Sequence, residues 1–155
     1  MRISEDFVVV PILEPLDTQA GIDGQSVNMG LVHSMAFPMV FGAITGDAVL
    51  KFYVGATDGT KTTAVAFSYR LSSGVYKAAS ADLLGDVTAV ASTGLTLTAA
   101  TFKNKTTIVE FDSDVIPVAT PWLTLELSAA ADVLLVSCSG IGRPRYQSKT
   151  GTSVV

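Results

Sequence analysis

The chain has 155 residues, of which 48% are hydrophobic and 15% are charged, and its formal net charge is −4. Its 10 Lys and Arg residues are scattered, which argues against nucleic-acid binding, because that binding depends on neutralising phosphates. A single Cys excludes an intrachain disulfide, and no stretch approaches the roughly 20 apolar residues that a membrane helix needs. We therefore expect no nucleic-acid partner and no membrane partner.

The length suits one domain with a substantial core. The surplus of apolar residues comes largely from Ala and Val in short segments. Either the core is large for the chain, or apolar surface is buried against other chains. The N-terminus does not have the pattern of a signal peptide, because Glu5 and Asp6 precede its apolar stretch while Pro11 and Pro15 interrupt it. We expect the protein to be made in a cytoplasm.

Residues 1–28 are predicted to form an extended N-terminal arm. The segment 7–13 has the pattern of an edge strand, since Pro11 removes one backbone donor. Residues that favour turns and extended chain follow it: Pro15, Gly21, Asp23, Gly24 and Asn28. The segment either reaches across to a neighbouring subunit or forms an ordinary first strand, and we favour the arm.

Residues 29–155 are predicted to form a single β-sandwich domain. The segment 31–44 indicates one or two strands with a break at Pro38, and the segment 48–70 indicates a hairpin around Asp58-Gly59. In that hairpin, Leu50, Phe52 and Val54 should meet Val65, Phe67 and Tyr69 across the core face. Further strands are predicted near residues 75–79, 86–91, 95–102, 106–112, 121–127, 133–138 and 141–147. The fold class is therefore all-β, an antiparallel β-sandwich of jelly-roll-like form with an N-terminal arm.

Catalytic equipment is sparse. His33 is the single imidazole, in an apolar strand with no carboxylate within four residues, and no Gly-x-Ser-x-Gly elbow is present. Cys138 follows an apolar run and is interpreted as a small buried hydrophobe. One Cys and one His cannot build a zinc site, and Asp112 and Asp114 are better explained as a solvated loop than as calcium ligands. We expect no enzyme activity, no metal and no cofactor.

Two segments are candidates for contact with partners. Near the C-terminus, Arg143 and Arg145 point the same way if the chain is extended, and Tyr146 follows them. Arg and Tyr are residue types that anchor interfaces, although a surface edge strand with solvated arginines explains them equally well. In the arm, the candidate contact residues are Phe7, Val9, Ile12 and Leu16.

These features together resemble the head decoration, or cement, proteins of tailed bacteriophages. The resemblance lies in the acidic chain of this length, the turn-rich segment 15–24, the Asp-Gly hairpin, the Thr/Ala/Val-rich core and the closing segment 143–146. The resemblance extends over essentially the whole chain and concerns general sequence character and composition. It implies a homo-oligomer, a trimer or similar cluster, at the local symmetry axes of an icosahedral capsid surface. There it would bridge neighbouring major capsid subunits and hold the expanded shell against internal DNA pressure.

Two other functions stay open. The chain could be a tail or fibre module that recognises a receptor or carbohydrate, because sugar binding uses exposed aromatic residues. The aromatic candidates do not cluster in the sequence: Trp122, Tyr53, Tyr76 and Tyr146. An enzyme on a jelly-roll scaffold is the third function, and the single His argues against its metal-dependent forms.

Overall fold

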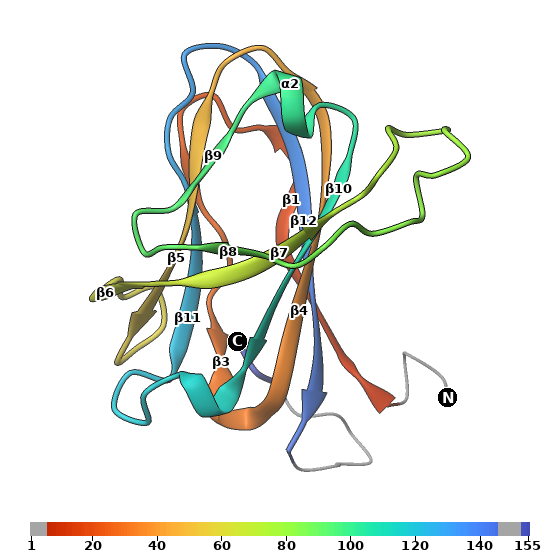
Figure 1. Ribbon diagram of the computed structural model, residues 1–155. Coiled ribbons are helices and arrows are strands. Elements are labelled where there is room, and N and C mark those ends of the chain that lie inside the picture. Colours follow the sequence, from red (N-terminus) through yellow and green to blue (C-terminus); the bar gives the residue numbers. More distant parts are fainter. Residues whose placement is uncertain (1–5, 146–152) are drawn as a thin grey trace.

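The computed structural model shows two antiparallel sheets packed face to face (Figure 1). It describes residues 6–145 and 153–155. The elements in chain order are β1 (Val8–Asp17), β2 (Ile22–Asp23), β3 (Val27–Asn28), η1 (Met29–Leu31), β4 (Val32–Ile44), β5 (Ala48–Gly55), β6 (Thr63–Val65), β7 (Phe67–Leu71), β8 (Thr88–Val90), β9 (Leu95–Leu97), α2 (Ala99–Phe102), β10 (Thr106–Asp112), η2 (Ser113–Val115), β11 (Trp122–Leu127) and β12 (Leu134–Pro144). The prediction of an all-β antiparallel sandwich is confirmed, while the jelly-roll form stays a prediction.

The first sheet has the strand order β1-β12-β4-β10-β7-β8, and the second has the order β2-β11-β5-β6. Two short strands extend the second sheet, β3 beside β11 and β9 beside β5. The chain crosses between the sheets at Ala66, so that β6 belongs to the second sheet and β7 to the first. This crossing ties the two layers together along one side of the sandwich.

Four phenylalanine rings hold the centre of the core. Phe52 projects from the second sheet against Phe37, Phe67 and Phe111 of the first, with ring centroids 5.2, 5.2 and 4.9 Å away. The rings meet at tilted or edge-on angles, the arrangement that the aromatic quadrupole favours. All four side chains are at most 6% exposed, so this cluster joins the two layers in the absence of water.

The predicted turn at Asp58-Gly59 is confirmed, whereas the predicted pairing of the two hairpin strands is only partly correct. Phe52 lies opposite Val65 across β5 and β6. Phe67 and Tyr69, however, lie in β7 of the other sheet, opposite Val90 and Thr88 of β8. The expectation that all three residues of the second strand pair with β5 is therefore wrong, because the chain bends at Ala66 and changes sheet.

The segment predicted as an arm is paired with its own chain over its described part. β1 runs antiparallel to β12, from Val8 opposite Gly142 to Asp17 opposite Leu135. β2 and β3 both pair with β11. Residues 8–28 therefore contribute strands to both sheets of this chain, and the domain boundary at residue 28 stays a prediction.

Four other expected strands differ from the structure. Residues 75–79 form part of a loop instead of a strand, with Lys77 at a positive φ of 69°. The segment 95–102 is a strand only as far as Leu97 and then turns into the helix α2. The two strands expected between 133 and 147 are one continuous strand over residues 134–144. In each case, whether the segment forms a strand depends on pairing with distant residues, and local residue preference cannot predict that pairing.

We predict that Phe52→Ala lowers the free energy of unfolding by about 3–5 kcal/mol, since it leaves a cavity against three rings. Urea unfolding followed by Trp122 fluorescence measures this loss. Val118→Ala is the control, because that side chain is 95% exposed and its loss should change stability by no more than about 0.5 kcal/mol. Equal losses in the two variants would show that the aromatic cluster does not hold the sandwich together.

Candidate functional site

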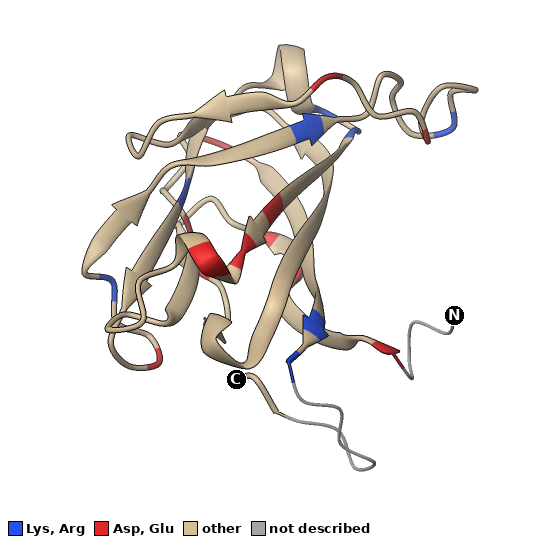
Figure 2. Cartoon of the chain, turned by 60° about the horizontal axis from the view of Figure 1, so that its bottom comes forward, with Lys and Arg blue, Asp and Glu red and all other residues tan. Residues whose placement is uncertain are grey.

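The outer face of the first sheet carries mainly small and apolar side chains over β4 and β12, with Glu110 and Asp112 on the neighbouring strand β10. On β4 every second residue points outward, and register places Ala36 opposite Ile141 and Pro38 opposite Ile108. β4 has no Lys, Arg, Asp or Glu, and β12 has only Arg143, so both strands are tan along almost their whole length in Figure 2. Such a face has few polar groups that can form hydrogen bonds with water, and it is suited to contact with another protein.

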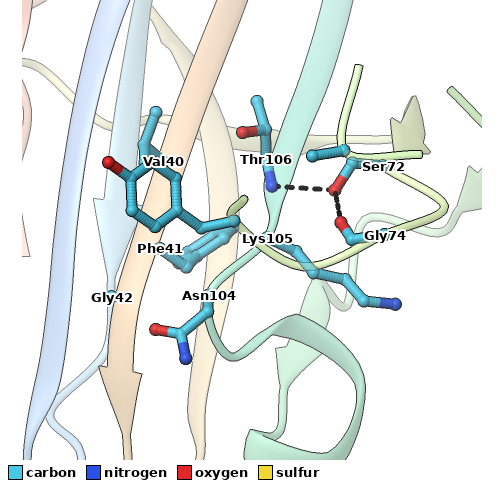
Figure 3. Close-up of a pocket in the computed structure, with 10 residues that line it drawn as sticks. Val40, Phe41, Gly42, Ser72, Gly74, Asn104, Lys105 and Thr106 are labelled. Carbon is cyan, nitrogen blue, oxygen red and sulfur yellow. Dashed lines mark hydrogen bonds between the residues drawn. The ribbon is translucent and has the colours of Figure 1, made fainter. Parts of the chain in front are cut away.

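Two hollows flank Val40 on this face, where its side chain is 53% exposed. The first has a volume of about 270 Å³ and is lined by Pro15, Leu16, Val40, Gly42, Leu135, Val136 and Ser137. The second, of about 280 Å³, lies between β4 and the loop that follows β7 (Figure 3). Figure 3 shows Ser72 holding that loop to the sheet, because its hydroxyl accepts from the Thr106 N–H and donates to the Gly74 carbonyl.

The loop between β7 and β8, residues 72–87, projects away from the sandwich (Figure 1). Backbone hydrogen bonds order it, including Ser73 N–H to the Leu83 carbonyl at 2.7 Å and Tyr76 N–H to the Asn104 carbonyl at 2.7 Å. Its exposed apolar side chains are Val75, Tyr76, Leu83, Leu84 and Val87. The outer face of the first sheet, the two hollows and this loop are called the apolar surface below.

The structure places two of the sequence-predicted contact residues on the apolar surface. Val9 is 55% exposed on β1, opposite Ile141, and Leu16 lines the first hollow. Ile12 points the other way, into the core, where it is 4% exposed and has no surface for a partner. The alternation of a strand explains this difference between Val9 and Ile12.

Three other predicted contact residues, Phe7, Arg143 and Arg145, lie at the other end of the sheet. Phe7 and Arg143 line one hollow of about 350 Å³ together with Glu110 and Asp112. Arg145 is bound to its own chain: its Nε donates to the Val32 carbonyl at 3.0 Å and its Nη2 to the Ser113 hydroxyl at 2.7 Å. Tyr146 lies outside the described residues.

Sequence reasoning missed the projecting loop. Its apolar residues were assigned in part to a strand at 75–79, and no contact role was given to Leu83 or Leu84. The available signal was the segment from 74 to 85, which is bounded by two glycines and lacks a regular alternation of apolar and polar residues. A run of that kind is more typical of a loop than of a strand.

The outer face of the second sheet is polar. Lys61 Nζ lies 2.8 Å from Asp23 Oδ1 and is hydrogen-bonded to Glu126 Oε2, and it stands over the Tyr53 ring at 5.6 Å from the centroid. The hydrogen bonds to Asp23 and Glu126 raise the pKa of Lys61 above 10.5. Trp122 and Glu126 lie on the same face of β11, beside Tyr53 of β5. The fold thus gathers two aromatic residues that are far apart in the sequence.

Reactive side chains are not assembled into a site in the described part of the chain. His33 is exposed on β4, whereas Cys138 is 2% exposed, and burial raises the pKa of its thiol to about 12. Among residues 6–145 and 153–155, no group of three or more His, Cys, Asp and Glu side chains is placed to hold a metal ion. No helix in the same residues is long and apolar enough to cross a membrane.

Comparison with known proteins finds no family model and no curated protein that matches the chain. Among solved structures, the SPBc2 prophage-derived protein YomS matches with a TM-score of 0.47 and 15% identity, over 88% of this chain and 94% of that one. Two structures of infectious bursal disease virus, of the Gx and Gt strains, match with TM-scores of 0.25 and 0.26 and identities of 14% and 15%. These matches cover 88% and 95% of this chain but 39% and 42% of the viral chains. At these TM-scores and identities, none of the likenesses is evidence of a shared function.

We predict that the stability of the wild type falls as pH rises above 10.5 by more than that of Lys61→Met. The folded state raises the pKa of Lys61, so its stabilising contribution is complete below the unfolded value of 10.5 and is lost as pH rises through the folded value. Urea unfolding of both proteins at neutral and strongly alkaline pH measures the difference. Parallel pH profiles would show that the ion pairs with Asp23 and Glu126 do not contribute in solution.

Proposed function

We propose that this chain is a structural virion protein, a capsid decoration or cement protein of a tailed bacteriophage. It binds the outside of the head as a trimer and stabilises the contacts between major capsid subunits. It acts without a cofactor and without enzymatic activity, and it makes no direct contact with nucleic acid or membrane. The observation that carries the proposal is the apolar surface, which one side of the sandwich presents and the other side does not.

The composition of the apolar surface supports a protein partner. Val9, Val40 and Leu135 are 55%, 53% and 40% exposed on three neighbouring strands, and the charged residues of that face include Glu110 on β10, opposite Ala36, and Arg143 near the end of β12. Removing such side chains from water is favourable by roughly 25 cal/mol per Å² of apolar area. Their short, stiff side chains also lose little conformational entropy when a partner covers them.

The projecting loop supports contact with more than one neighbour. It is ordered by hydrogen bonds and extends beyond the sheet (Figure 1), which supports contact with a different subunit from the one that covers β4. A small protein that touches several shell subunits, and other copies of itself, gains affinity from linked contacts even where each is weak. That is the physical basis on which a cement protein stabilises a shell.

A carbohydrate- or receptor-binding module of a phage tail or fibre is the second candidate. It is favoured by the placement of Tyr53 and Trp122 on one face of two neighbouring strands, where Tyr53 lies opposite Thr124 and Trp122 is two residues along from Thr124. Carboxylates of Asp23 and Glu126 lie near Tyr53 and Lys61 on that face. Aromatic rings with neighbouring carboxylates provide the stacking surface and the hydrogen-bond acceptors that a sugar needs.

We predict that Val40→Asp weakens binding to expanded capsids of the same phage by at least about tenfold, because it places a charge at the centre of the apolar surface. Co-sedimentation of the purified protein with capsids that lack it gives the affinity. Thr96→Asp is the matched control, since it adds the same charge to an exposed strand position on the opposite sheet. If both variants bind as the wild type does, the apolar surface is not the capsid-binding face.

Light scattering across a concentration series, alone and after release from capsids, tests the oligomeric state. A trimer mass in either sample agrees with the proposal. A monomer mass in both samples, with no capsid binding, contradicts it.

For the second candidate, we predict that glycan binding on an array disappears in Trp122→Ala and persists in Val40→Asp. The reason is that Trp122 provides the stacking surface and Val40 lies on the other sheet. A wild-type protein that binds no glycan on the array, yet binds capsids, would eliminate this candidate.

A further inference from the structure

A cavity of about 370 Å³ opens at the end of the sandwich where η1 and η2 lie. Its walls are mostly apolar, and its lining residues are Asn28, Met29, Gly30, Leu31, Ser113, Ile116, Pro117, Val118, Pro121 and Arg145. At its mouth Val118 is 95% exposed. The volume is at the lower end of the range for ligand pockets and suits one or two side chains.

The polar groups of this cavity donate hydrogen bonds. Asn28 Oδ1 already accepts from the Gly30 N–H at 3.0 Å, which leaves the Asn28 amide NH₂ as a donor. Arg145 is held in place by two neutral acceptors, the Val32 carbonyl and the Ser113 hydroxyl. None of the lining residues is Asp or Glu. The cavity therefore combines a fixed positive charge with an apolar wall.

The hydrogen bonds of Arg145 also determine which edge of its guanidinium is available. Val32 and Ser113 occupy the side formed by Nε and one bond of Nη2. Among the described residues, Nη1 makes no hydrogen bond, so the end formed by Nη1 and Nη2 can accept a carboxylate in the two-bond geometry. The nearest acid, Asp114, has its Oδ1 3.8 Å from Nη2 and its side chain is 94% exposed, so water screens this pair strongly.

We propose that this cavity receives an Asp or Glu side chain that is flanked by apolar residues on a partner protein. The carboxylate binds to Arg145 and to the Asn28 amide, and the neighbouring apolar side chains pack on Leu31, Ile116 and Pro117. Because Arg145 is already held, little entropy is lost on binding. This inference rests on the proposed function, since it names the chemistry by which a capsid subunit is recognised at a second point.

The test uses the full chain and a blocked tripeptide, Leu-Glu-Leu with acetylated and amidated ends, followed by NMR titration. The expected result is saturable shifts of the Arg145 Nε–H and Asn28 amide signals, at least about tenfold weaker binding of the Leu-Gln-Leu peptide, and loss of affinity with added salt. Equal binding of the two peptides, or no saturable shift with either, would overturn the proposal.

Charge changes at Val118 test the site without removing a residue that the fold uses. Val118→Glu should weaken binding of the Glu peptide by about fivefold and Val118→Lys should strengthen it, because both side chains stand at the exposed mouth. Arg145→Gln should abolish binding, with Arg145→Lys restoring it in part. An effect of the same sign from both Val118 variants would indicate disturbance of the loop and contradict the assignment.

Capsid binding separates this inference from the proposed function. A wild type that binds the Glu peptide but no capsid would overturn the decoration role and leave the carboxylate site standing. The second result is loss of capsid binding in Val40→Asp and unchanged capsid binding in Val118→Glu, with a wild type that does not bind the Glu peptide. That result would support the decoration role and overturn the carboxylate site.

Discussion

The packing of Phe52 against three rings of the opposite sheet is the interaction on which the rest of the structure depends. Phe37, Phe67 and Phe111 come from β4, β7 and β10, so one side chain fixes the second sheet over three strands of the first. Because strand side chains alternate, placing Phe37 inward places Ala36 and Pro38 outward. A shift of one residue in the strand register would turn Phe37 outward and Ala36 and Pro38 inward. Burial of the phenylalanine rings prevents such a shift.

The two outer faces of the sandwich follow from this arrangement and differ in character. The face of β4 and β12 is mostly apolar, with the exposed carboxylates of Glu110 and Asp112 beside it on β10, whereas the face of β5 and β11 carries Lys61 paired with Asp23 and Glu126. Water solvates the second face well and the first poorly. A protein of this kind gains most by covering its first face, and this gain is the physical basis of the proposed contact with a shell.

In the proposed role, the projecting loop and the cavity at η1 and η2 would add specificity to that contact. Apolar area attracts without direction, while a held guanidinium accepts a carboxylate only in a narrow geometry. The Arg145 side chain serves both the fold and the proposed recognition, because the bonds that tie it to β4 and η2 also aim its free edge. Affinity from the apolar surface and selection by Arg145 would then be separable in experiments.

The all-β class, the turn at Asp58-Gly59 and the inward faces of several strands can be predicted from the amino-acid sequence. Leu123, Leu125 and Leu127 share the buried face of β11 as their spacing predicts, and Cys138 is buried. These features depend on local alternation and on turn preference, both of which are written in neighbouring residues.

The pairing of the strands, the point where the chain changes sheet and the surface that is left apolar depend on contacts between distant parts of the chain. Phe67 faces Phe52 from the opposite layer instead of lying beside Val65, Ile12 is buried while Val9 is exposed, and the pairing of β5 with β11 brings Tyr53 and Trp122 onto one face. Residues 75–79 have an apolar pattern but no strand beside them, so they form a loop. Pairing and exposure are properties of residues brought together from far apart in the chain, and no local pattern of side chains encodes them.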